Sequence, residues 1–574
     1  MSISRREMLV HTGLLAGVTA MGRFAVADSS ATPASGADAN LFARLDEYVR
    51  QYMEEMKSPG MTLVLADRKG VRRVVDYGFG DLERRTPVAK DELFEIGSIS
   101  KSFVAICLLQ LHDEGKLDLH KQINDYLPWF RIDSKFKPIS THDLLTHGSG
   151  LPGNCPLLPS DPTLRHRAAY APGEHFHYCN LGYEALGHLA WTLDGRELPE
   201  VIRKRILEPL GMTQSEPVIT LDIRDRLVKN YSLFQNDRPN SRDARLAEAN
   251  GLIVTTGAGC VAATAKDMGA YTRMIANGGE GPNGRRLMSK ESFALFSKAH
   301  IVAEEFGPTA SYGYGIAVDK LDGHNVVRHT GGMTSFMSSL LVDIDNGVGA
   351  FASVNAQQGY RPTPVTQFAV QLMREQQLSK PLPAIPAPNP ALRVTNAADF
   401  AGAYQQTGGG KLEIEASGDK LFLVRSGGKT PLQPAGAPGA FVVADGGKSR
   451  FPLVFGRADA KDPKSAVVEV SWGGDWYTNA KYKGEKQFDV PKEWQSYVGH
   501  YRNENPWIGS IHVVLVKGRL TIDGLMPLEA AGGDRFNLRD EPHSPEWIQF
   551  GEVVNGRCMR LKFSGEDLWR VATA

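Results

Sequence analysis

A serine and a lysine three residues apart, Ser98 and Lys101, stand at the start of an apolar stretch that ends near Gly115. The stretch predicts a helix that begins at this pair, with Gly115 as its C-terminal cap. Residues i and i+3 share a helix face, so the Lys101 amine can reach the Ser98 hydroxyl. A serine becomes a good nucleophile only when a neighbouring base removes its proton, and burial can lower the pKa of a lysine enough for that task. The pair therefore predicts an acyl-transfer site, although alone it also fits an N-cap serine beside a solvated lysine.

Two later segments favour the acyl-transfer site over the structural alternative. The first carries Tyr178 and Asn180, separated by one residue. The second runs from His329 through Gly331 and Gly332 in a stretch that reads as strand, turn and strand. Each residue also has a structural reading: a core tyrosine, a turn asparagine and a strand histidine. The three segments together favour chemistry over these structural roles.

With the Ser98 pair, these segments match in order and rough spacing the three active-site elements of serine β-lactamases and penicillin-binding enzymes. The chain most closely resembles the class C β-lactamase-like serine hydrolases, a family that includes esterases, D-aminopeptidases and related amidases. Residues 141–152, 206–212 and 312–315 fit the same resemblance, which covers roughly residues 45–370. It implies an α+β catalytic domain of the penicillin-recognising fold, an antiparallel sheet flanked by helices, over residues 41–378.

The resemblance also implies roles. Ser98 would be the acylated nucleophile, and Lys101 and Tyr178 would share the proton network, either of them being the base. Asn180 would donate its amide to the acyl side chain of the substrate. The oxyanion hole would be the backbone N–H groups of Ser98 and Gly332.

His329 marks a departure from the β-lactamase pattern. Related β-lactamases usually have a lysine there, which helps to bind a substrate carboxylate, whereas a histidine is mostly neutral near pH 7. The residue resembles the His-x-Gly variant of D-aminopeptidases and several esterases, and makes a β-lactamase or carboxypeptidase less favoured. We place His329 with the catalytic residues, and Asn180, Gly331 and Gly332 with those that bind substrate. The two glycines would let the strand edge approach the substrate closely.

A proline-rich segment at residues 379–390 predicts an extended linker, and period-2 patterns beyond it predict short strands. Residues 400–404 resemble residues 497–501. We therefore expect two small antiparallel β-barrels, at 391–488 and 491–574, because closure removes exposed strand edges. They resemble the lipocalin-like barrels of D-aminopeptidase-type relatives. They brace the molecule, form a dimer contact or, as the resemblance implies, send a loop into the cleft, for which we expect residues 526–535.

The N-terminus looks like a twin-arginine export signal. Arg5 and Arg6 precede a mildly apolar stretch, and residues 25–27 read Ala-Val-Ala, an A-x-A cleavage site. An ordinary basic tail is the alternative. We expect a signal peptide over residues 1–27, a disordered leader over 28–40, and a mature protein that works in a bacterial periplasm or outside the cell, exported by the twin-arginine machinery.

Composition excludes several other classes. The 574 residues carry no net charge, which gives no indication of a nucleic-acid partner. No apolar run is long enough to span a membrane. The five cysteines read as small buried apolar residues, and the histidines lack the acidic or thiol companions of a metal site, so we expect neither metal nor cofactor. The sequence is compatible with a homo-oligomer.

We therefore expect an exported serine hydrolase that works through an acyl-enzyme. The favoured reading is a peptidase or amidase on small peptides with D- or other unusual residues, including a linearised cyclic peptide. Two alternatives remain open: a carboxylesterase on short acyl esters, and a periplasmic sensor of β-lactams or peptides that is acylated without turnover.

Overall fold

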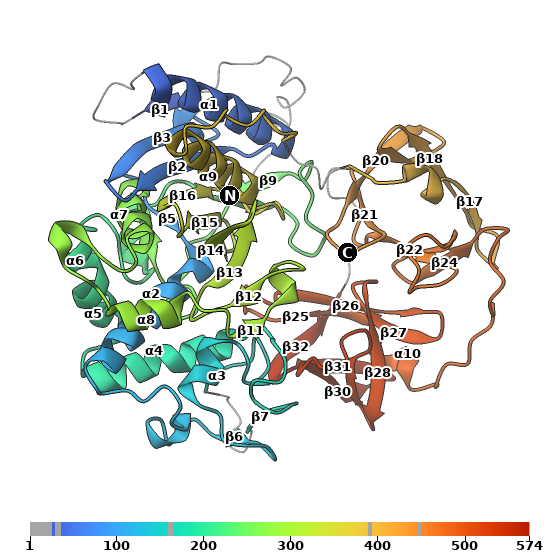
Figure 1. Cartoon of the computed structure of the whole chain (residues 1–574). Coiled ribbons are helices and arrows are strands. Elements are labelled where there is room, and N and C mark those ends of the chain that lie inside the picture. Colours follow the sequence, from blue (N-terminus) through green and yellow to red (C-terminus); the bar gives the residue numbers. More distant parts are fainter. Residues whose placement is uncertain (1–25, 29–35, 159–164, 389–392, 446–448, 573–574) are drawn as a thin grey trace, which may run out of the picture.

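The computed structural model describes residues 26–28, 36–158, 165–388, 393–445 and 449–572. A mixed domain of sheet and helices is followed by two separate β-barrels (Figure 1). This is the α+β arrangement with two C-terminal barrels that the sequence predicts.

The catalytic domain is built on one antiparallel sheet, with strand order β1-β3-β2-β16-β15-β14-β13-β12-β11 and β4 paired to β3. Its strands are β1 Val26–Asp28, β2 Gly60–Asp67, β3 Val71–Asp81, β4 Thr86–Pro87, β11 Ile301–Val302, β12 Ser311–Tyr312, β13 Ala317–Leu321, β14 His324–Gly332, β15 Met337–Asp343 and β16 Val348–Val354. The central strands β2, β15 and β16 are buried along their whole length, because helices cover both faces of the sheet.

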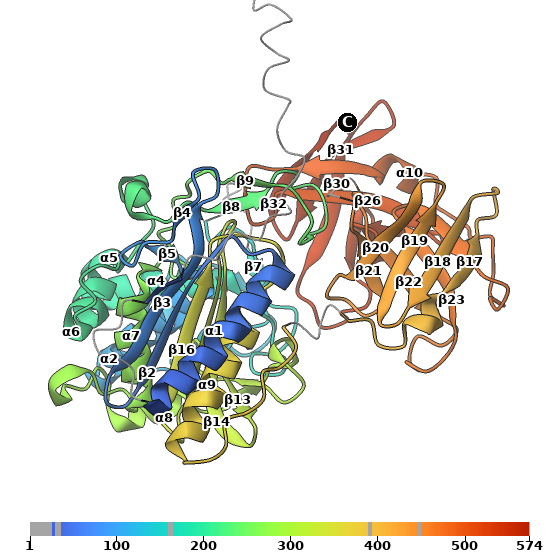
Figure 2. The same ribbon diagram turned by 90° about the horizontal axis from the view of Figure 1, so that it is seen from above.

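Helices α1 and α9 cover one face, and the remaining helices lie on the other (Figure 2). Tyr48 of α1 meets Phe368 of α9 edge to face, with ring centroids 4.9 Å apart. The helices of this domain are α1 Gly36–Met56, α2 Ser100–Asp113, α3 Thr141–Leu145, α4 Asn180–Asp194, α5 Leu198–Ile202, α6 Glu208–Leu210, α7 Ala265–Ala276, α8 Lys290–Phe296 and α9 Thr363–Gln377. Short strand pairs complete it: β5 Phe94–Glu95 with β10 Ala262–Ala263, β6 Ile132–Asp133 with β7 His166–Arg167, and β8 Tyr231–Leu233 with β9 Leu246–Glu248.

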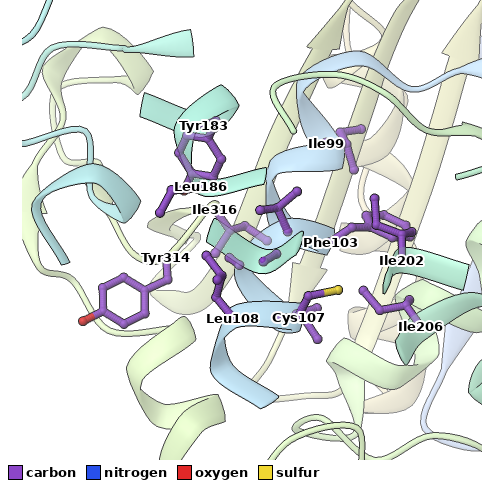
Figure 3. Close-up of a cluster of buried hydrophobic side chains, with 14 of the residues drawn as sticks. Ile99, Phe103, Cys107, Leu108, Tyr183, Leu186, Ile202, Ile206, Tyr314 and Ile316 are labelled. Atoms are coloured by element: carbon purple, nitrogen blue, oxygen red, sulfur yellow. The ribbon is translucent and has the colours of Figure 1, made fainter. Parts of the chain in front are cut away.

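Helix α2 lies inside the helical layer and is buried on nearly every side (Figure 3). Phe103 stacks on Tyr271 of α7 at a centroid distance of 4.1 Å. The predicted helix is confirmed, and Gly115 follows its C-cap with a φ of 71°. Because the first turns of this helix are fully buried, they carry Lys101 into the protein core.

The proline-rich segment runs along α1. Arg44 donates to the carbonyl of Pro383 at 3.0 Å, and Tyr48 donates to the carbonyl of Pro388 at 3.3 Å. Leu382 and Ile385 pack on the same apolar cluster as α1. The linker is therefore extended, as the prolines predict, but it is also attached to the catalytic domain.

Each barrel has eight antiparallel strands and is closed between its first and last strand. The first consists of β17 Gly402–Gln405, β18 Lys411–Ser417, β19 Lys420–Arg425, β20 Gly428–Pro434, β21 Ala440–Val443, β22 Leu453–Arg457, β23 Val467–Trp472 and β24 Asp475–Thr478. After α10 (Trp494–Tyr497), the second consists of β25 Gly499–Arg502, β26 Ser510–Val516, β27 Arg519–Ile522, β28 Met526–Gly532, β29 Arg535–Leu538, β30 Trp547–Val554, β31 Arg557–Phe563 and β32 Glu566–Val571.

The repeat seen in the sequence has a structural counterpart. Tyr404 donates its hydroxyl to the carbonyl of Phe400 at 2.9 Å, and Tyr501 donates to the carbonyl of Tyr497 at 2.7 Å. Both buried tyrosines thus tie the first strand of a barrel to the turn that precedes it.

Two predicted features differ from the structure. Helix α1 begins at Gly36, so residues 36–40 are helical and not part of a disordered leader. Residues 526–535 form the β28–β29 hairpin, and neither the cavity beside Ser98 nor the larger hollow beside Tyr178 has a lining residue from it. Most of the predicted signal peptide lies outside the described residues, although strand β1 pairs with β3 across the predicted cleavage point. Within the described part of the chain, we find no helix of the length and apolarity that a membrane crossing needs.

Candidate active site

Ser98 lies in a short 3-10 turn, Gly97–Ile99, directly before α2. Gly97 has a φ of 55°, a conformation that favours glycine. The end of β14 approaches this turn so closely that a Cβ on Gly331 would stand 1.9 Å from the carbonyl oxygen of Ile96. Two glycines therefore bring the strand end beside the serine, and both Ser98 and Gly332 line the same cavity.

Lys101 is fully buried, and its amine has three acceptors. Its Nζ donates to Ser98 Oγ at 3.1 Å, to Asn180 Oδ1 at 2.7 Å and to the carbonyl of Ala258 at 2.6 Å. Burial lowers the pKa of Lys101 to about 7, against a smaller opposing effect of the Glu184 carboxylate. A large fraction of the amine is therefore neutral near pH 7, as a general base must be.

Tyr178 stands on the other side of this pair. Its ring centroid lies 4.8 Å from Lys101 Nζ, and the neighbouring Ser98 hydroxyl opposes the effect of burial on the pKa of its phenol. Burial raises the pKa of Tyr178, so the phenol keeps its proton. The opposite shifts of the two groups favour Lys101 as the acceptor of the serine proton and Tyr178 as a proton donor.

Asn180, the first residue of α4, lines the cavity beside Ser98 and also contacts Lys101. Its Oδ1 accepts from Lys101, and its Nδ2 donates to Asn154 Oδ1 at 2.7 Å. The predicted donation to the acyl side chain of the substrate would have to share this Nδ2 group with Asn154. The structure thus gives Asn180 a second role, the orientation of the lysine amine.

His329 is placed differently from the prediction. The residue is 1% exposed and is not among those that line the cavity beside Ser98. Its Nδ1 donates to the Thr330 carbonyl at 2.7 Å, and its Nε2 accepts from the Tyr312 hydroxyl at 2.9 Å. Burial lowers the pKa of His329 to about 3, with Lys101 as the next contribution. A neutral ring with both nitrogens occupied supports the strand end and offers no charge to a substrate.

A cation near the site escaped the sequence reasoning. Arg361, in the loop directly before α9, is exposed, and its Nη2 lies 3.5 Å from the point where a Cβ on Gly332 would stand. Its guanidinium donates to no acceptor among the described residues. No motif surrounds Arg361 in the sequence, and only the fold brings it to the end of β14.

The cavity beside Ser98 has a volume of about 150 Å³ and is lined in part by the second barrel. Asn505, Trp507 and Glu566 of that barrel line it together with Ser98 and Glu184. The prediction that the last barrel reaches the cleft is therefore confirmed in general but wrong in detail. The segment that enters is the β25–β26 loop, with the start of β32, and not residues 526–535.

Among the described residues, the cysteines are buried thiols, and one histidine lies in a group with two aspartates. All five cysteines are free and buried, as predicted, and Cys179 caps the N-terminus of α4. Within the described residues, the group with metal-ligand spacing is His324, Asp343 and Asp345, at the far end of β14 and β15. The carboxylates of both aspartates already accept hydrogen bonds from Asn346 or Asn325. The serine centre is separate from it.

A serine hydrogen-bonded to a buried lysine, with a buried tyrosine ring beside them, defines the class: a serine hydrolase. The family model described as Beta-lactamase matches residues 45–372, and the chain belongs to this family.

Its relatives are distant. The chain is 29% identical over 351 residues to Penicillin-binding protein 4 of Amycolatopsis lactamdurans, covering 58% of this chain and 89% of that one. It is 25% identical over 335 residues to the D-aminopeptidase of Brucella anthropi, covering 55% of this chain and 59% of that enzyme. The octameric penicillin-binding protein homologue from Pyrococcus abyssi has the same fold, with a TM-score of 0.54 at 22% identity over 76% of this chain and all of that one.

Proposed function

We propose that the protein is an aminopeptidase-like amidase, which removes an N-terminal residue with a free amine from short peptides. The observation that carries this proposal is the charge of the cavity beside Ser98. Of the residues that line it, those with charged side chains are Glu184 and Glu566, both acidic. A cavity this small, next to the nucleophile and lined by two carboxylates, suits an acyl group that bears an ammonium.

Glu184 is suited to this role. Within the described residues its carboxylate has no hydrogen-bond or ion-pair partner, and burial raises its pKa to about 7, with Lys101 opposing and Glu566 adding to the shift. Glu566 accepts from Asn505 Nδ2 at 3.2 Å, which holds it in the cavity. A substrate ammonium would relieve the repulsion between the two carboxylates and keep both ionised.

The unpaired Arg361 favours short peptides with a free carboxylate. It lies beside Gly332, outside the residues that line the small cavity, where the part of the substrate that leaves would extend. A guanidinium recognises a carboxylate through paired hydrogen bonds. Arg361 would supply the cationic contact that His329, being neutral, does not.

The chemistry follows from the contacts. Neutral Lys101 accepts the Ser98 proton as the serine attacks the carbonyl carbon, and the backbone N–H groups of Ser98 and Gly332 stabilise the oxyanion. Tyr178 gives its proton to the departing amine and takes up the proton that Lys101 received from Ser98, so that both groups return to their starting states and the acyl-enzyme remains. A water molecule then attacks the ester, the network takes its proton, and Ser98 is released.

The preference for D-residues rests on the D-aminopeptidase among the relatives, not on a contact in the cavity. A linearised cyclic peptide with such a residue at its N-terminus is one substrate of this class. We also infer export through the twin-arginine route to the periplasm or the medium, on the basis of Arg5, Arg6 and the Ala25–Ala27 motif.

A matched substrate pair tests the proposal: kcat/KM on D-alanine p-nitroanilide and on D-alanine methyl ester, each beside its L-isomer and its N-acetyl derivative. We expect turnover of both D-compounds and at least about tenfold lower kcat/KM after acetylation, since a charge-assisted contact is lost. Turnover of esters alone, with no effect of acetylation, would support the carboxylesterase. Stable acylation without product release would support the sensor.

A further inference from the structure

Glu546 of the second barrel is buried against the catalytic domain, far in sequence from every predicted site residue. It lies just before β30 and is 8% exposed. Its Oε1 accepts from the backbone N–H of Gly153 at 2.6 Å and from His177 Nε2 at 3.1 Å. Its other oxygen accepts from the hydroxyl of Ser564, in the β31–β32 turn.

The carboxylate is ionised in this setting. Burial alone would raise the pKa of Glu546, but the hydrogen bonds from His177, Ser564 and Gly153 outweigh burial and lower it. An ionised carboxylate only accepts, so His177 must carry its proton on Nε2. Glu546 therefore fixes both a backbone position and a ring orientation in the catalytic domain.

Both contacts lead directly to the catalytic groups. The carbonyl of Gly153 accepts from the backbone N–H groups of Asn180 and Leu181, at 2.8 and 3.2 Å, and so holds the start of α4. A Cβ on Gly153 would stand 2.8 Å from the Tyr178 carbonyl oxygen and 3.1 Å from Glu546 Oε1. The loop at Gly153 therefore lies so close to Glu546 of the second barrel and to Tyr178 that only glycine fits there without a shift.

His177 carries the second connection, because it precedes Tyr178 in the chain. Its backbone N–H donates to the carbonyl of His147 at 2.9 Å, and the Cys179 N–H donates to His147 Nδ1 at 2.9 Å. The His147 ring lies 4.4 Å from the Tyr178 ring, centroid to centroid. His147 therefore fixes the residues on both sides of Tyr178, which are His177 and Cys179. His177 is also bound to Glu546 of the second barrel.

We propose that Glu546 is a positioning residue for Tyr178, so that the second barrel is part of the apparatus that protonates the leaving group. The inference rests on the proposed acyl-enzyme chemistry. Lys101 depends less on Glu546, because the Ala258 carbonyl also holds its amine. Loss of Glu546 should thus impair proton delivery to the leaving group more than activation of the serine.

Two substrates with different leaving groups separate this role from simple bracing. The amine of D-alanine p-nitroanilide needs a proton to leave, whereas the phenolate of p-nitrophenyl acetate does not. In Glu546→Ala we expect the ratio of kcat on the anilide to kcat on the ester to fall by about tenfold or more, as for an impaired general acid. KM should change little, and Ser98 should still react with a fluorophosphonate.

Matched variants complete the experiment in the full-length protein. Glu546→Gln keeps an acceptor for Gly153 and His177. The ratio of kcat on the anilide to kcat on the ester should therefore fall less in Glu546→Gln than in Glu546→Ala. The exposed Glu552 of β30 supplies the control, and Glu552→Gln should leave the ratio unchanged. If Glu546→Ala does not fold, Glu546→Gln must still lower the ratio. An equal loss on both substrates, or no loss, overturns the inference, whereas a wild-type protein inactive on both would overturn the proposed function instead.

Discussion

At the scale of single residues, we infer that the protonation state of the Lys101 amine controls the reaction. Its amine is buried in the first turn of α2, and burial lowers its pKa to about 7, so a base is available without a change in conformation. The same burial keeps Tyr178 protonated. One desolvated site thus produces both an acceptor and a donor of protons.

The first prediction concerns pH. Because the neutral amine is the base and its pKa in the folded protein is lowered, kcat/KM should rise as pH increases through about 7. The measurement is a rate profile from pH 5 to 9 on p-nitrophenyl acetate, which has no ammonium for Glu184 to bind. The rise should persist in Glu184→Gln. A midpoint near that of a free lysine would contradict the account.

A second prediction concerns Arg361 and His329. Arg361→Ala should raise KM for D-alanyl-glycine, which has a free carboxylate, by about tenfold, the effect of one charge-assisted contact, and leave KM for D-alanine p-nitroanilide unchanged. His329→Gln, a change at the neutral and internally bonded ring, should not distinguish the two substrates. If His329→Gln weakened the dipeptide selectively, the histidine and not the arginine would face the carboxylate.

Residue types and spacing were enough to predict Ser98, Lys101 and Tyr178, which the structure brings into contact. They were not enough for Arg361 or Glu546. Each is a single charged residue in an unremarkable stretch, and each reaches the site through a long-range contact that only the fold creates.

At the scale of elements, the end of β14 must lie against the turn that carries Ser98. We predict that Gly331→Ala lowers kcat/KM by about 100-fold, since its Cβ would overlap the Ile96 carbonyl and a displacement of about 1 Å can cost that much. Gly332→Ala is the matched variant, because its Cβ would meet only flexible side chains at 3.5 Å or more. Similar losses of kcat/KM in Gly331→Ala and Gly332→Ala, at unchanged thermal stability, would show that the close packing of β14 against the Ser98 turn does not cause the loss.

The elements were predictable where periodicity was clear and not where a boundary depended on packing. The apolar run after Ser98 predicted α2, and the repeated aromatic segment predicted two barrels. The polar, alanine-rich residues 36–40 read as a leader, yet they extend α1, whose later turns pack on the sheet. Tertiary contacts thus override a local composition that resembles disorder.

At the scale of the whole molecule, the second barrel forms part of the wall of the cavity beside Ser98. It supplies Trp507 and Glu566 to the lining, and Glu546 to the loop before α4. Sequence reasoning expected a loop from this barrel and placed it in the β28–β29 hairpin, because nothing in a chain of short strands tells which barrel end faces the cleft.

The fourth prediction tests this arrangement. Glu566→Gln should raise KM for D-alanine p-nitroanilide by about tenfold through the loss of one charged contact to the ammonium, and leave KM for the N-acetyl derivative unchanged. Glu529→Gln, on the exposed face of β28, is the control in the same barrel. An equal change in KM for both substrates would mean that the barrel shapes the cavity but that Glu566 does not bind the substrate ammonium.

The central claim is that Ser98 forms the covalent intermediate. The most direct measurement is the intact mass of the protein after treatment with a fluorophosphonate, for the wild type and for Ser98→Ala, with circular dichroism to confirm that both are folded. We predict one adduct on the wild type and none on Ser98→Ala. An adduct of equal yield on the folded variant would contradict the account.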